Sequence, residues 1–279
     1  EIKPNKIDKD IIDGKDLLNH NYTITYADEA SKFINYIRKE YEIVICYLIG
    51  FNNEKQGIYN YCPAAMQLSD GTVYIYFRAD AAANNRYENF GQIVGKVVID
   101  LNGKTLNCTS GDTIYVQAFN GFAVTVEDSS ENKTGVIRSE TGSAIDVGVG
   151  SKFILNSGTI TAENDYAIMA AYREKNHSLL EVNGGTVNGV VMCYADSVVT
   201  GGTFNDMFAI SYNYKQNKFS GGIFNGGIKI NSFDSLNDIL ADGYHYRNAQ
   251  GNIVDGSSKI IEEKVTIEKG ADFSADAVV

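Results

Sequence analysis

One six-residue phrase recurs four times in this 279-residue chain, and it restricts the possible folds more than any other feature. Its first and last positions are apolar, its second is small and polar, its third and fourth are Gly or Ser, and its fifth is mostly Thr. Successive copies begin 27, 17 and 20 residues apart. The four copies are LNSGTI (155–160), VNGGTV (182–187), VTGGTF (199–204) and FSGGIF (219–224). An earlier segment, LNGKTL (101–106), fits every column but the fourth, and a degenerate copy lies at 134–137.

A second phrase alternates with the first along the chain. Its copies are AIDV (144–147), AIMA (167–170), VVMC (190–193), AISY (209–212) and GIKI (227–230). These segments are too short for helical repeats, and a propeller blade needs about 40 residues. A sandwich or barrel would show turn signals without the long-range recurrence of one phrase. The sequence therefore predicts an all-β solenoid, a parallel β-helix in which equivalent residues of neighbouring coils stack on one another.

Stacking assigns a role to each column of the repeat. We expect the first and sixth positions of the six-residue phrase to fill the interior. The glycine pair is expected at a sharp bend, where a positive φ or a close backbone approach excludes a side chain. We expect the small polar column to form a ladder between coils. The outward column of the second phrase is predicted to be Asp146, Met169, Met192, Ser211 and Lys229, and that of the first phrase Thr105, Thr159, Thr186, Thr203 and Ile223.

The segments outside the repeat predict covers for the two open ends of the stack. Near the start, Ala27 to Tyr41 has the pattern of an amphipathic helix, followed by strands at Glu42 to Ile49 and Gly71 to Phe77. Near the end we expect a short helix at 236–240 closed by a glycine at 243, a hairpin at 244–254 and a strand at 264–267. The prediction is one continuous domain, with an α/β N-terminal cap and first irregular coils in 1–95, β-helix coils in 96–233 and a small C-terminal cap in 234–279.

These segments also carry a family resemblance. The stretch IDLNGKTL (99–106), the Gly-Gly-Thr copies and the stretch LADGYHY (240–246) together resemble secreted or surface proteins of Gram-positive bacteria. Those proteins contain a right-handed parallel β-helix of the pectin-lyase-like type. The resemblance covers residues 95–255 and implies the right-handed form of the coil. It implies no particular activity, and no catalytic motif of the lyases or glycosidases of this fold matches numbered positions here.

Charge and composition narrow the partners and the location. The net charge of −11 disfavours nucleic acid, because an acidic surface repels phosphate. The longest apolar run, Ile43 to Ile49, is too short to cross a bilayer, so we expect no membrane insertion. The chain begins without Met, which fits a secreted or cell-surface protein whose signal peptide has been removed, or a trimmed chain. The four widely spaced cysteines are expected to be mainly buried thiols: Cys46, Cys62, Cys108 and Cys193.

No cluster of catalytic or metal-binding residues is recognisable in the sequence. Neither outward column is rich in carboxylates, which lyases and hydrolases of this fold need. The three histidines lack metal-ligand spacing: His20, His177 and His245. Acidic turn residues occur at Glu127, Asp128 and Glu131 and at Glu163 and Asp165. We interpret them as solvated turn residues, with a loosely bound calcium ion as the alternative, and we expect no other cofactor.

The feature that favours binding is an apolar and aromatic column on one outward face. Its candidate residues are Met169, Tyr172, Met192, Tyr194 and Tyr214. Tyrosine rings stack on sugars and supply a hydroxyl group, as they do at many protein interfaces. The leading expectation is a non-catalytic extracellular or cell-surface protein that binds a glycan, a host surface or another protein. A polysaccharide lyase or hydrolase with a loop-built site and a structural spacer are the alternatives.

Overall fold

The computed structural model describes residues 64–67, 73–77, 80–83, 92–93, 96–116, 121–173, 176–211, 218–231 and 234–270. These residues form an all-β structure with long parallel sheets, and their only helix is one turn of 3-10 helix, η3 (Leu236–Ile239). The strand expected at Gly71 to Phe77 is present as β2 (Val73–Tyr76). The helix expected at Ala27 to Tyr41 and the strand expected at Glu42 to Ile49 lie outside the described residues.

Three sheets contain almost all of the strands. Sheet A has the spatial order β1 (Ala64–Gln67), β2, β5 (Lys96–Asp100), β8 (Ala123–Glu127), β11 (Lys152–Leu155), β16 (Leu179–Val182), β19 (Asp196–Val199), β22 (Lys218–Phe219). Sheet B has the order β26 (Ile253–Val254), β25 (Tyr244–Asn248), β28 (Val265–Lys269), β23 (Ile223–Phe224), β20 (Thr203–Phe204), β17 (Thr186–Asn188), β12 (Thr159–Ala162), β9 (Val136–Ser139), β6 (Thr105–Cys108), β3 (Ala81–Ala83). Sheet C has the order β27 (Ile260–Ile261), β24 (Ile228–Ile230), β21 (Phe208–Ile210), β18 (Val191–Cys193), β13 (Ile168–Ala170), β10 (Ile145–Val147), β7 (Ile114–Val116), β4 (Gln92–Ile93). A separate hairpin consists of β14 (Tyr172–Arg173) and β15 (Asn176–His177).

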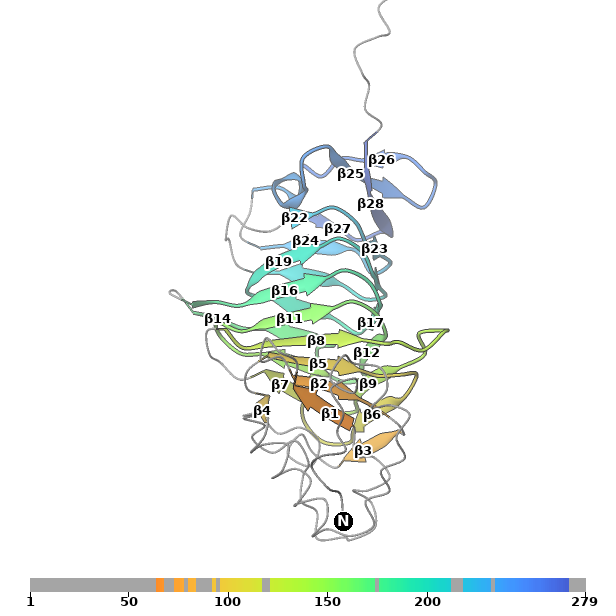
Figure 1. The fold of residues 1–279 in the computed structure, drawn as a ribbon. Coiled ribbons are helices and arrows are strands. Elements are labelled where there is room, and N and C mark those ends of the chain that lie inside the picture. Colours follow the sequence, from red (N-terminus) through yellow and green to blue (C-terminus); the bar gives the residue numbers. More distant parts are fainter. Residues whose placement is uncertain are drawn as a thin grey trace, which may run out of the picture.

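The chain visits the three sheets in a fixed rotation. From β5 to β24 it enters sheet A, then B, then C, and returns to A beside the strand it left, apart from the inserted hairpin β14–β15. We call one such pass a coil. Neighbouring coils pair in parallel in every sheet, and the strands stack along one column in Figure 1. This arrangement is the one that a parallel β-helix requires.

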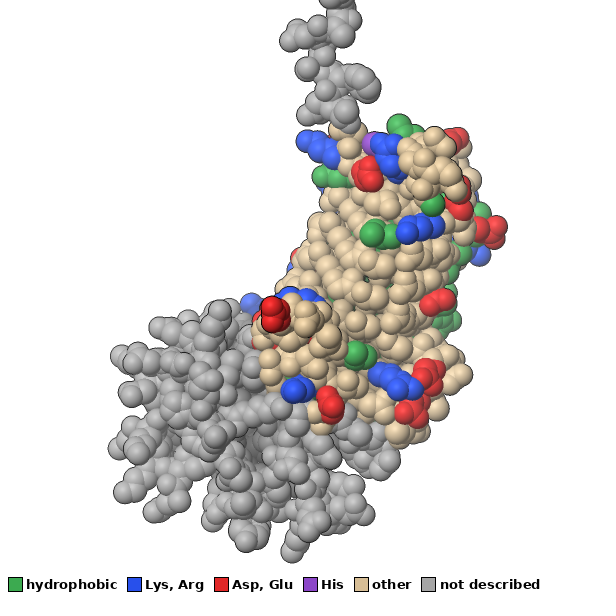
Figure 2. Space-filling view, turned by 90° about the vertical axis from the view of Figure 1, so that its right-hand side faces the viewer, with side chains coloured by type: hydrophobic (Ala, Val, Ile, Leu, Met, Phe, Trp, Pro, Cys, Tyr) green, Lys and Arg blue, Asp and Glu red, His purple; other side chains and the backbone are tan. Residues whose placement is uncertain are grey.

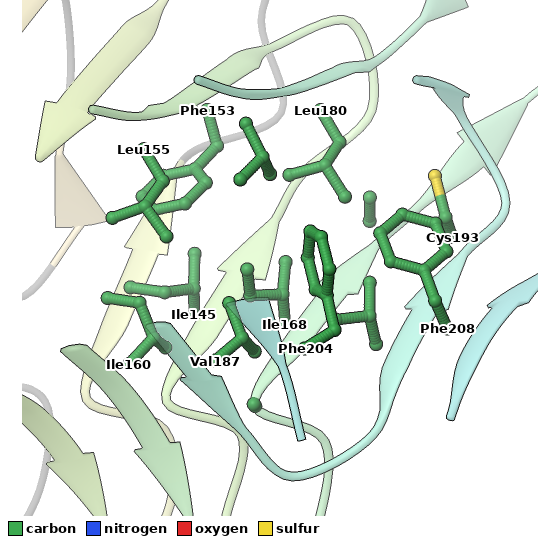
Figure 3. Close-up of a cluster of buried hydrophobic side chains, with 14 of the residues drawn as sticks. Ile145, Phe153, Leu155, Ile160, Ile168, Leu180, Val187, Cys193, Phe204 and Phe208 are labelled. Atoms are coloured by element: carbon green, nitrogen blue, oxygen red, sulfur yellow. The ribbon is translucent and has the colours of Figure 1, made fainter. Parts of the chain in front are cut away.

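The first and sixth positions of the six-residue phrase lie inside the column, as predicted. The residues at these positions are fully or almost fully buried in all four copies: Leu155, Val182, Val199 and Phe219, and Ile160, Val187, Phe204 and Phe224. Figure 3 shows side chains from all three sheets meeting in this interior. Near the C-terminal end, aromatic rings fill the core. The Phe204 and Phe224 rings stack at 4.8 Å, and the Phe208 ring meets that of Phe204 edge-on at 5.0 Å.

The glycine pair occupies the corner between sheets A and B for two separate reasons. A Cβ atom on Gly201 would lie 2.4 Å from the carbonyl oxygen of Asn183 in the coil below. The next residue, Gly202, has a φ of +92°, a conformation that disfavours side chains. The prediction of close approach and positive φ at this bend is confirmed. Ser157 stands at the first of these positions in its copy, and its hydroxyl accepts a hydrogen bond from the Asp128 N–H at 2.8 Å.

The structure corrects the alignment of the earliest copy. Leu106 is in register with Ile137, and Ile137 with Ile160, so the sixth column is continuous. The first column instead continues through Val126 to Ile99, not to Leu101. The corner after β5 is therefore two residues longer than in the Gly-Gly-Thr copies, and the buried Leu101 lies within it.

The C-terminal strands run against the parallel coils. In sheet B, β28 pairs antiparallel with β23, and β25 pairs antiparallel with β28. In sheet C, β27 pairs antiparallel with β24. The expected hairpin is present as β25 and β26, and the expected last strand as β28. Where a short helix closed by Gly243 was expected, there is only the single 3-10 turn η3, which is capped at Leu240. These strands lie at the end of the column opposite β1 to β4 (Figure 1).

Candidate functional site

The outward column of sheet C contains the two methionines of the predicted binding face. Met169 of β13 and Met192 of β18 are register partners, and each lies half-buried between fully buried neighbours. Below Met169 the column continues with Asp146 and then Tyr115. The adjacent methionines therefore form a small apolar patch on the outer surface of this sheet, which we call the apolar step.

Above Met192, the structure corrects the predicted column. The register partner of Met192 is Ala209, and Ala209 in turn is paired with Lys229. Ser211 was expected in this place, but it lies in the next outward column, after β21. There its hydroxyl accepts a hydrogen bond from the Asn231 side-chain amide at 2.8 Å and lies 3.5 Å from the Met192 sulfur.

The three candidate tyrosines differ in what the structure describes. Tyr194 directly follows β18 and is half-buried, and its N–H donates to the Ala170 carbonyl oxygen at 2.9 Å. Tyr194 is thus placed beside Met192 at the end of the strand. Tyr172 belongs to the backbone of β14, where it pairs with His177. Tyr214 lies outside the described residues.

Sheet B has a different outward surface, made of uncharged polar side chains. Thr159, Thr186 and Thr203 are successive register partners, with Val136 before them and Ile223 after them. All three threonines are half-buried. Figure 2 views the molecule from the side of sheet B, and the middle of the column is largely free of charged side chains there.

Two ladders of side-chain hydrogen bonds flank this threonine column. On the corner between sheets A and B, the Asn183 amide donates to the Asn156 oxygen at 3.0 Å, and the Thr200 hydroxyl donates to the Asn183 oxygen at 2.7 Å. This ladder confirms the prediction for the small polar column. We name it the corner ladder.

The second ladder lies on the other side of the threonines, one place beyond the six-residue phrase. Asn188 donates to the Thr161 hydroxyl at 3.2 Å, Asn205 to the Asn188 oxygen at 2.6 Å, and Asn225 to the Asn205 oxygen at 2.7 Å. We name it the sheet B ladder. This ladder was not predicted, although Thr, Asn, Asn and Asn follow directly after the four copies of the phrase.

Sheet A carries charged residues on its outer face. Lys152 of β11 and Glu181 of β16 form an ion pair with an Nζ–Oε2 distance of 2.6 Å. Hydrogen bonds from Lys152 and Asn183 lower the pKa of the Glu181 carboxyl. The outer faces of the three sheets thus differ in chemistry.

The acidic turn residues have separate structural roles. The Asp128 carboxylate is buried and accepts N–H groups of Gly103 at 2.8 Å, Ser130 at 3.0 Å and Gly135. Burial raises the pKa of this carboxyl, but the hydrogen bonds from Ser130, Gly135 and Gly103 outweigh burial and leave the pKa below its ordinary value of 3.8. Asp128 thereby fastens the long corner after β8 to the coil beneath it.

The second acidic pair lies in the turn after β12. Glu163 forms an ion pair with Arg138 of the neighbouring strand, and the Asp165 carboxylate accepts the Tyr166 N–H at 2.8 Å. Among the described residues, no group of three or more His, Cys, Asp or Glu side chains is arranged to hold a metal ion.

Comparisons with known proteins give no relative. No protein-family model matches the chain, no curated protein matches its sequence, and no solved structure matches it. Within the described part of the chain, no helix has the length and apolar character needed to cross a membrane.

Proposed function

We propose that the protein is a non-catalytic, secreted or cell-surface binding protein, built as a right-handed parallel β-helix of the pectin-lyase-like kind with capped ends. Its ligand is a carbohydrate or the surface of a host molecule or other protein. The parallel sheets and the rotation of the chain through them support the β-helix. The strong preference of parallel strand crossovers for the right hand supports the right-handed form.

The observation that carries the binding function is the apolar step on sheet C. Met169 and Met192 are stacked in register on an outward face, and Tyr194 lies beside them at the strand end. Methionine adapts its shape to a partner, and tyrosine offers a ring and a hydroxyl group together. Both residue types are enriched where proteins contact partners.

A glycan array and a pull-down from surface extracts test this proposal with the full chain. The double variant Met192→Ala, Tyr194→Ala is expected to weaken binding at least about tenfold, because such side chains dominate binding energy at interfaces. Ile154→Ala is the matched control, since Ile154 is a half-buried outward apolar residue of sheet A. Equal unfolding midpoints of the two variants would show that both remain folded.

The same assay separates the alternatives. Release of new reducing ends or of unsaturated uronates from a polysaccharide panel would show a lyase or hydrolase and contradict the non-catalytic assignment. Binding that survives in the double variant would contradict the sheet C site. Absence of both binding and cleavage would favour a structural spacer.

A further inference from the structure

The outer face of sheet B presents a regular set of hydroxyl and amide groups that the fold does not use. Among the described residues, none forms a hydrogen bond with the side-chain hydroxyls of Thr159, Thr186 or Thr203. These hydroxyls recur once per coil, at the strand spacing of about 4.8 Å. The result is a row of unused donors and acceptors running across the strands.

The two flanking ladders fix the geometry around this row. Each asparagine inside the sheet B ladder donates one N–H and accepts one hydrogen bond within the ladder. A carboxamide has two N–H groups and two acceptor sites, so one of each remains for another molecule. Because the ladder bonds hold the amides in place, a ligand would not need to order them on binding, and that lowers the entropic cost of association.

Charge and shape select the kind of ligand. From β12 to β20, all outward residues of sheet B are uncharged: Thr159, Thr161, Thr186, Asn188, Thr203 and Asn205. An anionic polymer would find no cation among these six residues and would meet a protein of net charge −11. A protein partner would find no apolar anchor there, and such anchors form the centre of protein interfaces.

We infer that the sheet B face is a binding surface for a linear, uncharged polysaccharide that lies along the stacking direction and hydrogen-bonds to successive coils. This inference rests on the proposed binding function and adds to the sheet C site a second surface, specific for neutral polysaccharide, on a different face. Sugar hydroxyls donate and accept, as the threonine hydroxyls and ladder amides do. Val136 and Ile223 end the row, so the surface spans three coils.

Affinity electrophoresis with defined polysaccharides tests the inference. The neutral probes are a β-1,3-glucan, hydroxyethylcellulose, a xylan and a galactomannan, and the anionic probes are polygalacturonate and hyaluronan. We expect retardation by at least one neutral probe and none by the anionic ones. The retardation should be insensitive to salt, because no ion pair contributes to it.

Variants then assign the surface. Thr186→Val keeps the branched shape and removes the hydroxyl group, so it should weaken binding about fivefold. The triple variant Thr159→Val, Thr186→Val, Thr203→Val should weaken it by on the order of 100-fold if the three losses add. Thr186→Ser should retain most of the binding. Thr125→Val is the matched control, because Thr125 is a half-buried outward threonine on sheet A.

The possible outcomes distinguish failure of the sheet B surface from failure of the proposed binding function. Unchanged retardation of the triple variant, or equal loss in the Thr125→Val control, overturns the sheet B surface. If Met192→Ala, Tyr194→Ala abolishes retardation and the triple variant does not, the binding function stands and its site is sheet C. If no neutral probe is retarded, the inference fails, and the glycan array and pull-down decide the binding function separately.

Discussion

The corner glycines show how a single residue limits what a coil can accept. Gly201 has no room for a side chain, because a Cβ atom there would meet the Asn183 carbonyl oxygen at 2.4 Å. Gly111 has a φ of +80°, but a Cβ atom there would meet nothing within 4 Å. The effect of close backbone approach on stability can therefore be measured at Gly201, and the effect of a positive φ at Gly111.

Substituting these two glycines should give unequal losses of stability. We expect Gly201→Ala to reduce the free energy of unfolding by about 2–3 kcal/mol, since neighbouring coils must shift apart. Gly111→Ala should cost only about 1 kcal/mol, from the positive φ alone. Urea denaturation of both variants provides the comparison, and a larger loss for Gly111→Ala would contradict the close stacking at the corner.

Asp128 makes the long corner after β8 sensitive to acid. Its carboxylate accepts three backbone N–H groups, and an amide in its place would turn a donor toward one of them. Asp128→Asn should therefore lower the free energy of unfolding by about 2 kcal/mol at neutral pH.

The pH dependence of that loss follows from the direction of the pKa shift. The folded pKa lies below 3.8, so the folded state favours the ionised form and this stabilisation is present above the unfolded pKa. It disappears as the pH falls through the folded pKa. The gap in stability between the wild type and Asp128→Asn should be constant above about pH 5 and narrow below pH 4. A gap that widens in acid would show that burial of the charge dominates instead.

At the scale of elements, the sequence predicts the faces of strands better than their register. A two-residue slip leaves every side chain on the same face, because side chains alternate with a period of two. The copy AISY at 209–212 fits the second phrase, yet Phe208, not Ile210, is the register partner of Val191. Because the predicted alignment was wrong by two residues, Ile210 was still correctly assigned to the interior. Ser211, however, was assigned to the outward column of Met192, where Ala209 lies.

The corners limit prediction for a different reason. The corner at Leu101 is two residues longer than those at the Gly-Gly-Thr copies. The segment LNGKTL resembles those copies, so the difference in length cannot be seen from the sequence. The sheet B ladder depends on pairing between coils, which a single phrase does not show. The inward columns were predictable because burial in the stacked coils demands the same residue type in each.

A buried hydroxyl group links β25 to η3. The Tyr246 side chain of β25 is fully buried, and its hydroxyl donates to the Leu236 carbonyl oxygen at 2.8 Å. Burial also raises the pKa of the Tyr246 hydroxyl, so the group stays protonated and able to donate. The bond holds the 3-10 turn against the antiparallel strands.

Tyr246→Phe should reduce the free energy of unfolding by about 1–2 kcal/mol, because the buried Leu236 oxygen loses its partner. Tyr244→Phe is the control, since Tyr244 is only half-buried in the same strand. Thermal unfolding of both variants measures the difference. Equal midpoints would mean that the hydroxyl bond contributes nothing to holding this end together.

At the scale of the whole molecule, no coil can bury its core alone. Each strand between the ends of its sheet pairs with a strand on either side, and one buried apolar cluster runs from Phe77 to Ile267. In repeat architectures of this kind, stability is the sum of weak units and the contacts between neighbours. Coils far apart in the sequence should therefore open together.

Cysteine labelling measures that cooperativity. Cys108 and Cys193 are buried and lie in different coils, and burial raises the pKa of the Cys193 thiol to about 12. Neither should react with iodoacetamide in the native protein, because the thiolate is the reactive form. Peptide mass spectrometry across a urea series should show both becoming reactive at the same concentration. Labelling of one well before the other would show that the column opens in parts.

The function is harder to predict from the sequence than the fold is, because one fold can carry many different binding surfaces. The threonine and asparagine columns of sheet B are also good strand and ladder formers, so their letters alone do not separate structure from binding. Support for a binding role comes from the structure, in which the threonine hydroxyls have no hydrogen-bond partner among the described residues and lie between two ladders of hydrogen-bonded side chains.

The stacked coils depend on one arrangement, in which the Gly-Gly-Thr segments lie over one another in parallel register. Amide-to-amide nuclear Overhauser effects in the deuterated, nitrogen-15-labelled protein test it most directly. We expect contacts that link the strand of Thr186 with those of Thr159 on one side and Thr203 on the other, in parallel order. Contacts showing antiparallel pairing between these segments, or none between them at all, would contradict it.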